Sequence, residues 1–108
     1  MLGLKPQEIE SIRRVFAGHP QILRGVVFGS RAKGNFKPFS DIDISIVTNG
    51  LDHHRFISIL SELDDLLLPY EIDLLEYDSI TNVDLKDHID RVGVEIYSRA
   101  PHPDTKQK

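Results

Sequence analysis

The sequence contains no cysteine and no long run of apolar residues. Without cysteine, the chain can form neither a disulfide framework nor a thiolate metal site. A membrane-spanning helix needs about 18 or more consecutive apolar residues, so we expect no association with a membrane. The first residues, MLGLKPQEIE, lack the apolar core of a signal peptide, and we therefore expect a cytoplasmic protein.

Positive charge is also scarce. The chain has 13 Lys and Arg residues against 17 Asp and Glu residues, which gives a net charge of −4. This balance argues against direct nucleic-acid binding driven by charge. It leaves room for a small anionic ligand that is held at a local site.

Helical and strand patterns alternate along the 108 residues, which are enough for one globular domain. The predicted strands are Gly25–Phe28, Asp41–Val47, Ile72–Leu75 and Val94–Tyr97, and the predicted helices run from Pro6 to Gly18, from Phe56 to Leu67 and from Val83 to about Arg91. This alternation predicts an α/β or α+β domain, in which helices pack on a sheet. We expect the domain to cover residues 1–99 and residues 100–108, which lack an apolar anchor, to form a disordered tail.

Asp41 and Asp43 break the local rules of their predicted strand. Isoleucines alternate with them and form the core face, so both carboxylates point to the opposite side. Carboxylates at positions i and i+2 repel each other, and Asp disfavours strands. Such conflicts are expected at functional sites, although a solvated polar face is the simpler interpretation.

Asp73 lies on the next predicted strand, between two apolar residues, and would face the same side as Asp41 and Asp43. Carboxylates that converge from two strands are hard oxygen ligands, which suit Mg²⁺ or Mn²⁺ rather than Zn²⁺. Two such ions, about 3.5–4 Å apart, commonly serve displacement reactions at phosphorus. A charge at a strand edge is the plain alternative, and two neighbouring glutamates compete for the role: Glu71 and Glu76.

The run Gly29–Ser30–Arg31–Ala32–Lys33–Gly34 follows a predicted strand and begins a helical turn. Gly29 has no Cβ, so a phosphate could approach its backbone. Ser30 offers a hydroxyl group, and Arg31 and Lys33 offer positive charge to phosphate oxygens. The run matches neither the P-loop nor the dinucleotide-binding fingerprint, and its alternative is a plain turn with two surface charges.

Gly29–Ser30, ten intervening residues, Asp41–Ile42–Asp43 and a later Asp73 together resemble the signature of the DNA polymerase β type of nucleotidyltransferase. Within that superfamily the chain is most similar to the minimal nucleotidyltransferases (MNT) of bacteria and archaea, which are often encoded beside a HEPN-type partner protein. The similarity runs from about Leu23 to Tyr97, without a departure at a motif position.

The resemblance implies a short mixed β-sheet with helices packed on one face, the nucleotidyltransferase fold. It implies that Asp41 and Asp43 bind two Mg²⁺ ions and the nucleotide phosphates. Asp73 would bind the ion nearer the acceptor hydroxyl and help to deprotonate it, while Gly29 and Ser30 hold the β- and γ-phosphates. A hydroxyl group would attack the α-phosphorus of ATP or another nucleoside triphosphate, with pyrophosphate leaving. The histidines are not needed for this chemistry.

The acceptor is the open question. Larger relatives carry a second domain for it, so a homodimer mate or a separate protein would have to present the acceptor here. For minimal members the resemblance implies a toxin–antitoxin pair, in which the antitoxin transfers AMP to a tyrosine of a HEPN-type toxin. The alternatives are transfer to a small molecule with a helical partner, and a module that binds nucleotide or partner without catalysis.

Overall fold

The computed structural model describes residues 2–99. Its sheet has the strand order β3-β2-β1-β4, with the strands β1 (Ile22–Phe28), β2 (Ile42–Thr48), β3 (Ile72–Glu76) and β4 (Val94–Ser98). Strand β1 pairs antiparallel with β2 and β4, whereas β2 pairs parallel with β3, so the sheet is mixed. The mixed sheet with its helices confirms the predicted fold class. The predicted tail, residues 100–108, lies outside the described residues.

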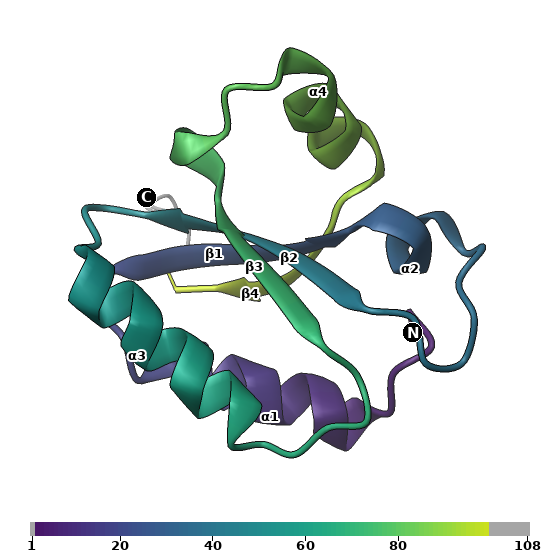
Figure 1. Ribbon diagram of the computed structural model, residues 1–108, viewed down its shortest axis with the longest axis horizontal. Helices are drawn as coiled ribbons and strands as arrows, with labels where there is room; N and C mark the ends of the chain where they lie inside the picture. Colours follow the sequence, from purple (N-terminus) through teal and green to yellow (C-terminus); the bar gives the residue numbers. More distant parts are fainter. Residues whose placement is uncertain (1, 100–108) are drawn as a thin grey trace, which may run out of the picture.

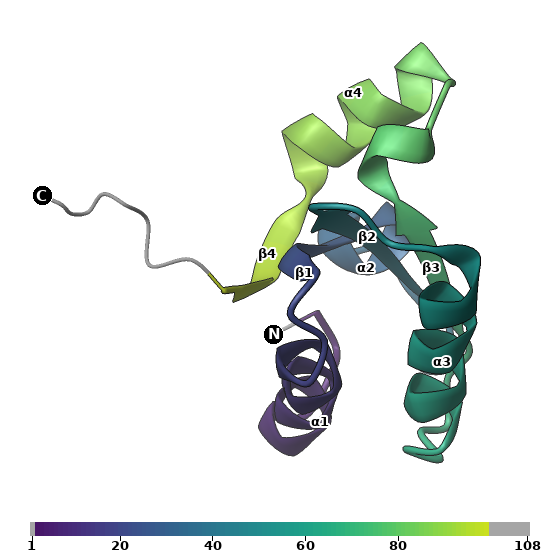
Figure 2. The same cartoon turned by 90° about the vertical axis from the view of Figure 1, so that its left-hand side faces the viewer.

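The helices lie on both sides of this sheet (Figures 1 and 2). They are α1 (Pro6–Ala17), α2 (Gly29–Lys33), α3 (His53–Asp64) and α4 (Val83–Val92), with a 3₁₀ turn, η1, at Tyr77–Ser79. Helices α1 and α3 lie side by side against one face, while α4 and η1 lie on the other. The resemblance had implied helices on one face, and α4 departs from that expectation. Among residues 2–99, no helix is long and apolar enough to cross a membrane.

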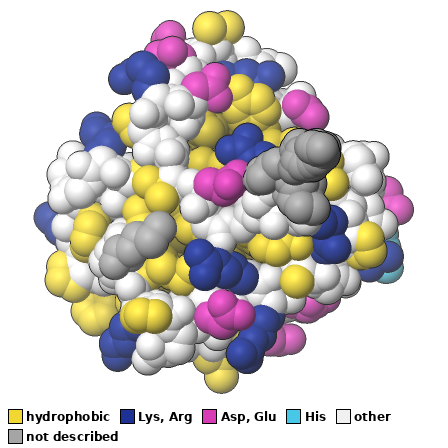
Figure 3. All heavy atoms as spheres, turned by 180° about the vertical axis from the view of Figure 1, so that it is seen from behind, with side chains coloured by type: hydrophobic (Ala, Val, Ile, Leu, Met, Phe, Trp, Pro, Cys, Tyr) yellow, Lys and Arg dark blue, Asp and Glu magenta, His cyan; other side chains and the backbone are white. Residues whose placement is uncertain are grey.

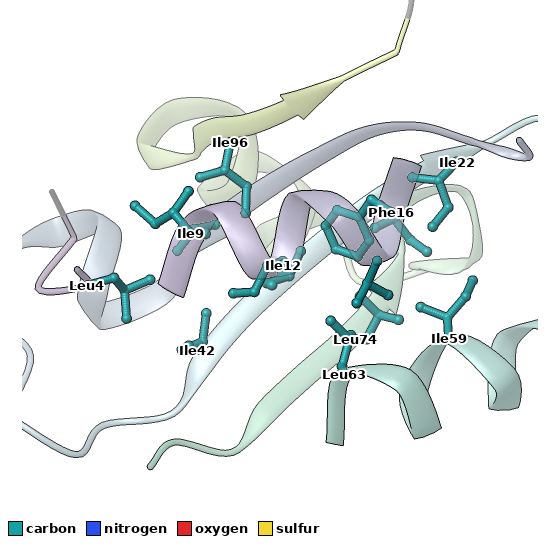
Figure 4. Close-up of a cluster of buried hydrophobic side chains, with 14 residues drawn as sticks. Leu4, Ile9, Ile12, Phe16, Ile22, Ile42, Ile59, Leu63, Leu74 and Ile96 are labelled. Atoms are coloured by element: carbon teal, nitrogen blue, oxygen red, sulfur yellow. The ribbon is translucent and has the colours of Figure 1, made fainter. Parts of the chain in front are cut away.

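The main core fills the space between the sheet and the helices α1 and α3 (Figure 4). The isoleucines of β2 that alternate with the polar residues are completely buried there: Ile42, Ile44 and Ile46. From α1, the apolar stripe that ends at Phe16 packs against them, and Pro6 opens this helix as predicted. This packing fixes which face of β2 is inside, so the other face must carry its carboxylates.

The second, smaller core explains why α4 lies on the opposite face. Val26 and Phe28 of β1 point away from the main core, and Ile89 of α4 covers them. Helix α4 approaches β1 so closely that a Cβ atom on Gly93 would collide with a Val26 side-chain carbon and the Ile89 carbonyl oxygen. Helix α4 is therefore held firmly beside the polar face of β2.

Charges are mixed on the side of the molecule that faces away from the viewer in Figure 1. There, Lys and Arg side chains lie next to Asp and Glu side chains and to apolar patches, rather than gathering in one region (Figure 3). Elsewhere in the sheet, Arg24 of β1 forms an ion pair with Glu95 of β4, with 2.6 Å between Nε and the carboxylate oxygen. The features that distinguish the site lie elsewhere, where β1 ends and β2 and β3 begin.

Candidate active site

Strand β2 brings the predicted carboxylates to one place. In the sheet register, Asp43 lies opposite Phe28, the last residue of β1, and also opposite Asp73 of β3. Neighbouring strands are about 4.8 Å apart, so the two aspartates stand side by side. Asp41 precedes β2 by one residue and is exposed. The structure thus places the three aspartates together and next to the start of α2.

Asp43 is the electrostatic centre of this cluster. Burial raises the pKa of its carboxyl group above the ordinary value, and the carboxylates of Asp73 and Asp41 raise it further. A hydrogen bond with Asp73 has the same effect on the pKa, whereas His88 lowers it. The site therefore favours a proton, or another positive charge, beside Asp43.

The donor set suits a hard divalent cation. Among residues 2–99, no three His, Cys, Asp or Glu side chains already surround one point as a metal group. Mg²⁺ does not need such a cage, because it keeps several waters and binds through one or two carboxylates together with substrate phosphates. The adjacent carboxylates of Asp43 and Asp73, with Asp41 nearby, fit an ion of that kind.

The junction of β1 and α2 requires glycine at position 29 for two reasons, the local backbone conformation and the proximity of Asp43. Its φ of +74° lies in the left-handed region, which side chains with a Cβ rarely adopt. A Cβ atom on Gly29 would also collide with the Oδ2 atom of Asp43. The backbone of the Gly–Ser motif and the Asp43 carboxylate therefore touch. Ser30 follows half-buried, and Lys33 is exposed at the end of α2.

Arg31 differs from its predicted role. Its side chain is only 2% exposed, and its guanidinium group donates hydrogen bonds to three backbone carbonyls: those of Leu2, Pro38 and Ser40. The same group lies 4.5 Å from the centre of the Tyr70 ring and 5.0 Å from that of Phe36. A buried group with these partners is not available to a phosphate. Arg31 holds the segment before Asp41 in place instead.

A groove adjoins the cluster, between α3 and the start of β3. It encloses about 1070 Å³, and Asp41 lies in its wall together with Leu60, Leu68 and Ile72. Phe39 in the same wall is 74% exposed, an unusual degree for a large apolar side chain. Of the three aspartates, Asp41 is thus open to solvent and to other molecules from this side.

His88 of α4 is a site residue that the sequence analysis did not identify. Its Nε2 atom accepts a hydrogen bond from the Gly29 backbone N–H at 3.1 Å. Its ring packs edge-on against Phe28, with 6.1 Å between the ring centres. No motif marks this histidine, because it lies 59 residues from Gly29 in the chain.

A model of the family described as polymerase beta, nucleotidyltransferase, matches residues 10–102. The chain belongs to this nucleotidyltransferase family. The matched range includes the Gly–Ser motif and all the aspartates of the cluster. The match of this nucleotidyltransferase to its family thus spans the part of the chain that holds the candidate site.

Among curated proteins, this nucleotidyltransferase is similar to the probable protein adenylyltransferase MntA of Haemophilus influenzae. The two are 29% identical over 102 residues, which cover 91% of this chain and 86% of that protein. MntA is therefore a distant relative of nearly the same extent.

Solved structures support the fold. A toxin–antitoxin structure with AMP-PNP matches with a TM-score of 0.68 and 23% identity, over 89% of this chain and 75% of that one. The complex of a tri-AMPylated Shewanella oneidensis HEPN toxin with its MNT antitoxin matches with a TM-score of 0.67 and 18% identity. That match covers 89% of this chain and 74% of the other. At these identities, the likeness establishes the fold that this nucleotidyltransferase shares with them.

Proposed function

We propose that this nucleotidyltransferase transfers AMP from ATP to a hydroxyl group of a HEPN-type partner protein, as the antitoxin of a toxin–antitoxin pair. The observation that carries the proposal is the pairing of Asp43 with Asp73 in the sheet register, directly against Gly29. The name of the Haemophilus influenzae relative, a probable protein adenylyltransferase, supports the reaction type. The Shewanella oneidensis complex, in which an AMPylated HEPN toxin accompanies an MNT antitoxin, supports the acceptor.

The three aspartates of the cluster and the Gly–Ser turn have separate roles in this proposal. Asp41, Asp43 and Asp73 would hold two Mg²⁺ ions, or Mn²⁺ in their place. Such ions, when bound, neutralise charge on phosphate and make a hydroxyl group more acidic. Gly29 and Ser30 would bind the β- and γ-phosphates, and the exposed Lys33 adds positive charge beside them.

The reaction replaces a phosphoanhydride bond of ATP with a phosphoester bond to the acceptor. The acceptor oxygen forms a bond to the α-phosphorus of ATP, and the bond from that phosphorus to the β-phosphate bridging oxygen breaks. Pyrophosphate leaves, and the proton of the acceptor hydroxyl passes to Asp73 and on to water. A tyrosine is a favourable acceptor, because its phenol ionises near pH 10. The protein contributes mainly by fixing the reactants and balancing their charge.

Transfer to the partner can be measured directly. The chain is mixed with ATP, MgCl₂ and its proposed HEPN-type partner, and intact-mass spectrometry should find one or more AMP additions on the partner. Asp41→Asn, Asp43→Asn and Asp73→Asn should each abolish the additions. Asp84→Asn, an exposed acidic residue on α4, is the control and should leave them unchanged.

The outcomes separate the proposal from its alternatives. If the original chain adds no mass to the partner, and the three Asp→Asn variants still inhibit the partner, the chain neutralises it by contact alone. If the partner gains no mass and pyrophosphate is released only when a small hydroxyl compound is added, the acceptor is a small molecule. Either result would overturn protein AMP transfer.

A further inference from the structure

The half-buried imidazole of His88 lies against the backbone of the Gly–Ser turn. The Gly29 N–H points at its Nε2 atom, 3.1 Å away. The Nε2 atom accepts through its lone pair, so a replacement side chain would need an acceptor atom at this position to keep the hydrogen bond. His88 thus contacts the Gly–Ser motif through a hydrogen bond from one backbone N–H group, that of Gly29.

The ring is fixed from behind. Phe28 contacts it edge-to-face, with the two ring planes at 80°. The next residue along α4, Ile89, is buried against Val26 and Phe28. A Cβ atom on Gly93 would collide with a Val26 side-chain carbon, so the end of α4 lies in close contact with β1. His88 therefore projects from a helix that is packed against the sheet, as a positioning group requires.

The N–H group that donates to His88 belongs to Gly29, a residue whose backbone conformation and surroundings are tightly restricted. Gly29 has a positive φ and touches Asp43, so a rotation of its peptide would move both Ser30 and the space left for the carboxylate. An N–H group at this junction without a partner would be free to turn. One hydrogen bond from α4 therefore links the geometry of the phosphate-binding turn to that of the aspartates.

We propose that His88 is a positioning residue for nucleotide binding, which holds the Gly29 peptide so that Ser30 and Asp43 keep their relative places. The inference rests on the proposed function for its ligand, ATP with Mg²⁺. It does not require that AMP be transferred to a particular acceptor.

The test replaces the imidazole in two ways. His88→Ala removes the acceptor, whereas His88→Gln offers a carbonyl oxygen at about the position of Nε2. The dissociation constant for ATP with MgCl₂ is measured by calorimetry for the full chain and both variants. Loss of one hydrogen bond that orients the turn should weaken binding by about 3- to 10-fold in His88→Ala, and Gln should restore most of it. His54→Ala is the matched control, because His54 is exposed on α3, on the far side of the sheet.

A second measurement observes the turn itself. In an amide ¹⁵N–¹H spectrum without nucleotide, the Gly29 resonance should shift in His88→Ala and return toward its original position in His88→Gln. Both measurements are made well below the Tm of each variant, where nearly all chains are folded, so that a modest loss of stability leaves the apparent dissociation constant unchanged.

The results distinguish this inference from the proposed function. Unchanged ATP binding in His88→Ala, or a Gly29 resonance that does not move, would overturn the role of His88. Weakened binding without any AMP transfer by the original chain would support His88 and overturn the proposed reaction.

Discussion

Neutralising Asp43 should make the protein more stable at neutral pH, although it removes a site residue. Neighbouring strands put Asp43 and Asp73 about 5 Å apart. Two unit charges at that distance repel by about 0.8 kcal/mol in water, and by about 3 kcal/mol at an effective dielectric constant of about 20. Because Asp73 is exposed and Asp43 is half-buried, we expect Asp43→Asn to raise the free energy of unfolding by about 1 kcal/mol.

The pH dependence gives this prediction its sign. The pKa of Asp43 is raised in the folded protein, so its contribution to stability is present below the unfolded pKa of about 3.9 and is lost as the pH rises through the folded pKa. At pH 7.5 the ionised side chain therefore costs stability, which the asparagine avoids. Near pH 3 the aspartate is protonated in both states, and the two proteins should differ little.

Thermal unfolding followed by circular dichroism in EDTA measures the effect. A gain of about 1 kcal/mol corresponds to a rise in Tm of about 4–8 °C for a domain of this size. Asp84→Asn, which removes a favourable acidic charge from the first turn of α4, should instead lower Tm slightly. An Asp43→Asn protein that is no more stable at pH 7.5, or whose advantage persists at pH 3, would refute the electrostatic reasoning.

Three further predictions concern the site and its support. MgCl₂ should raise the Tm of the original chain by more than that of Asp43→Asn, and EDTA should reverse the rise in a dye-based melting assay. Gly29→Ala should displace the Asp43 carboxylate and strain the turn by at least about 1 kcal/mol. Both the Tm and the increase in Tm on adding Mg²⁺ should therefore be smaller than in the original chain. An unchanged increase would contradict the contact between Gly29 and Asp43. Arg31→Ala should lower the free energy of unfolding in urea by about 3 kcal/mol, because it removes a buried guanidinium group together with its hydrogen bonds to three backbone carbonyls. Arg31→Lys should recover little, because an ammonium group lacks the planar fork. Full recovery by lysine would mean that charge alone matters at this position.

The sequence was informative where the pattern is local. Strict alternation along β2 identified both the buried isoleucines and the side that carries Asp41 and Asp43, because side-chain direction in a strand has a period of two residues. The same parity argument put Asp73 on the side of Asp41 and Asp43, and the sheet register shows that Asp73 lies opposite Asp43.

Partners from distant parts of the chain could not be predicted. Arg31 had the appearance of a phosphate ligand because it follows Gly29–Ser30, yet its burial depends on Leu2 and Tyr70, which no local pattern connects to it. His88 was set aside with the other histidines, because no local pattern connects it to Gly29. The face chosen by α4 was also missed, since helical spacing indicates an apolar stripe but not the surface that the stripe will cover.

Strand β3, at the end of the strand order, has a consequence for handling the protein. An edge strand offers unpaired backbone groups to other chains, and charged side chains discourage such pairing. On and beside β3 these charges are Glu71, Asp73 and Glu76. The side chain of Asp73 therefore also protects against self-association, and Asp73→Asn weakens that protection. Preparations of this variant should be checked by size-exclusion chromatography before a loss of transfer is attributed to chemistry, because aggregated chains would be inactive for a different reason.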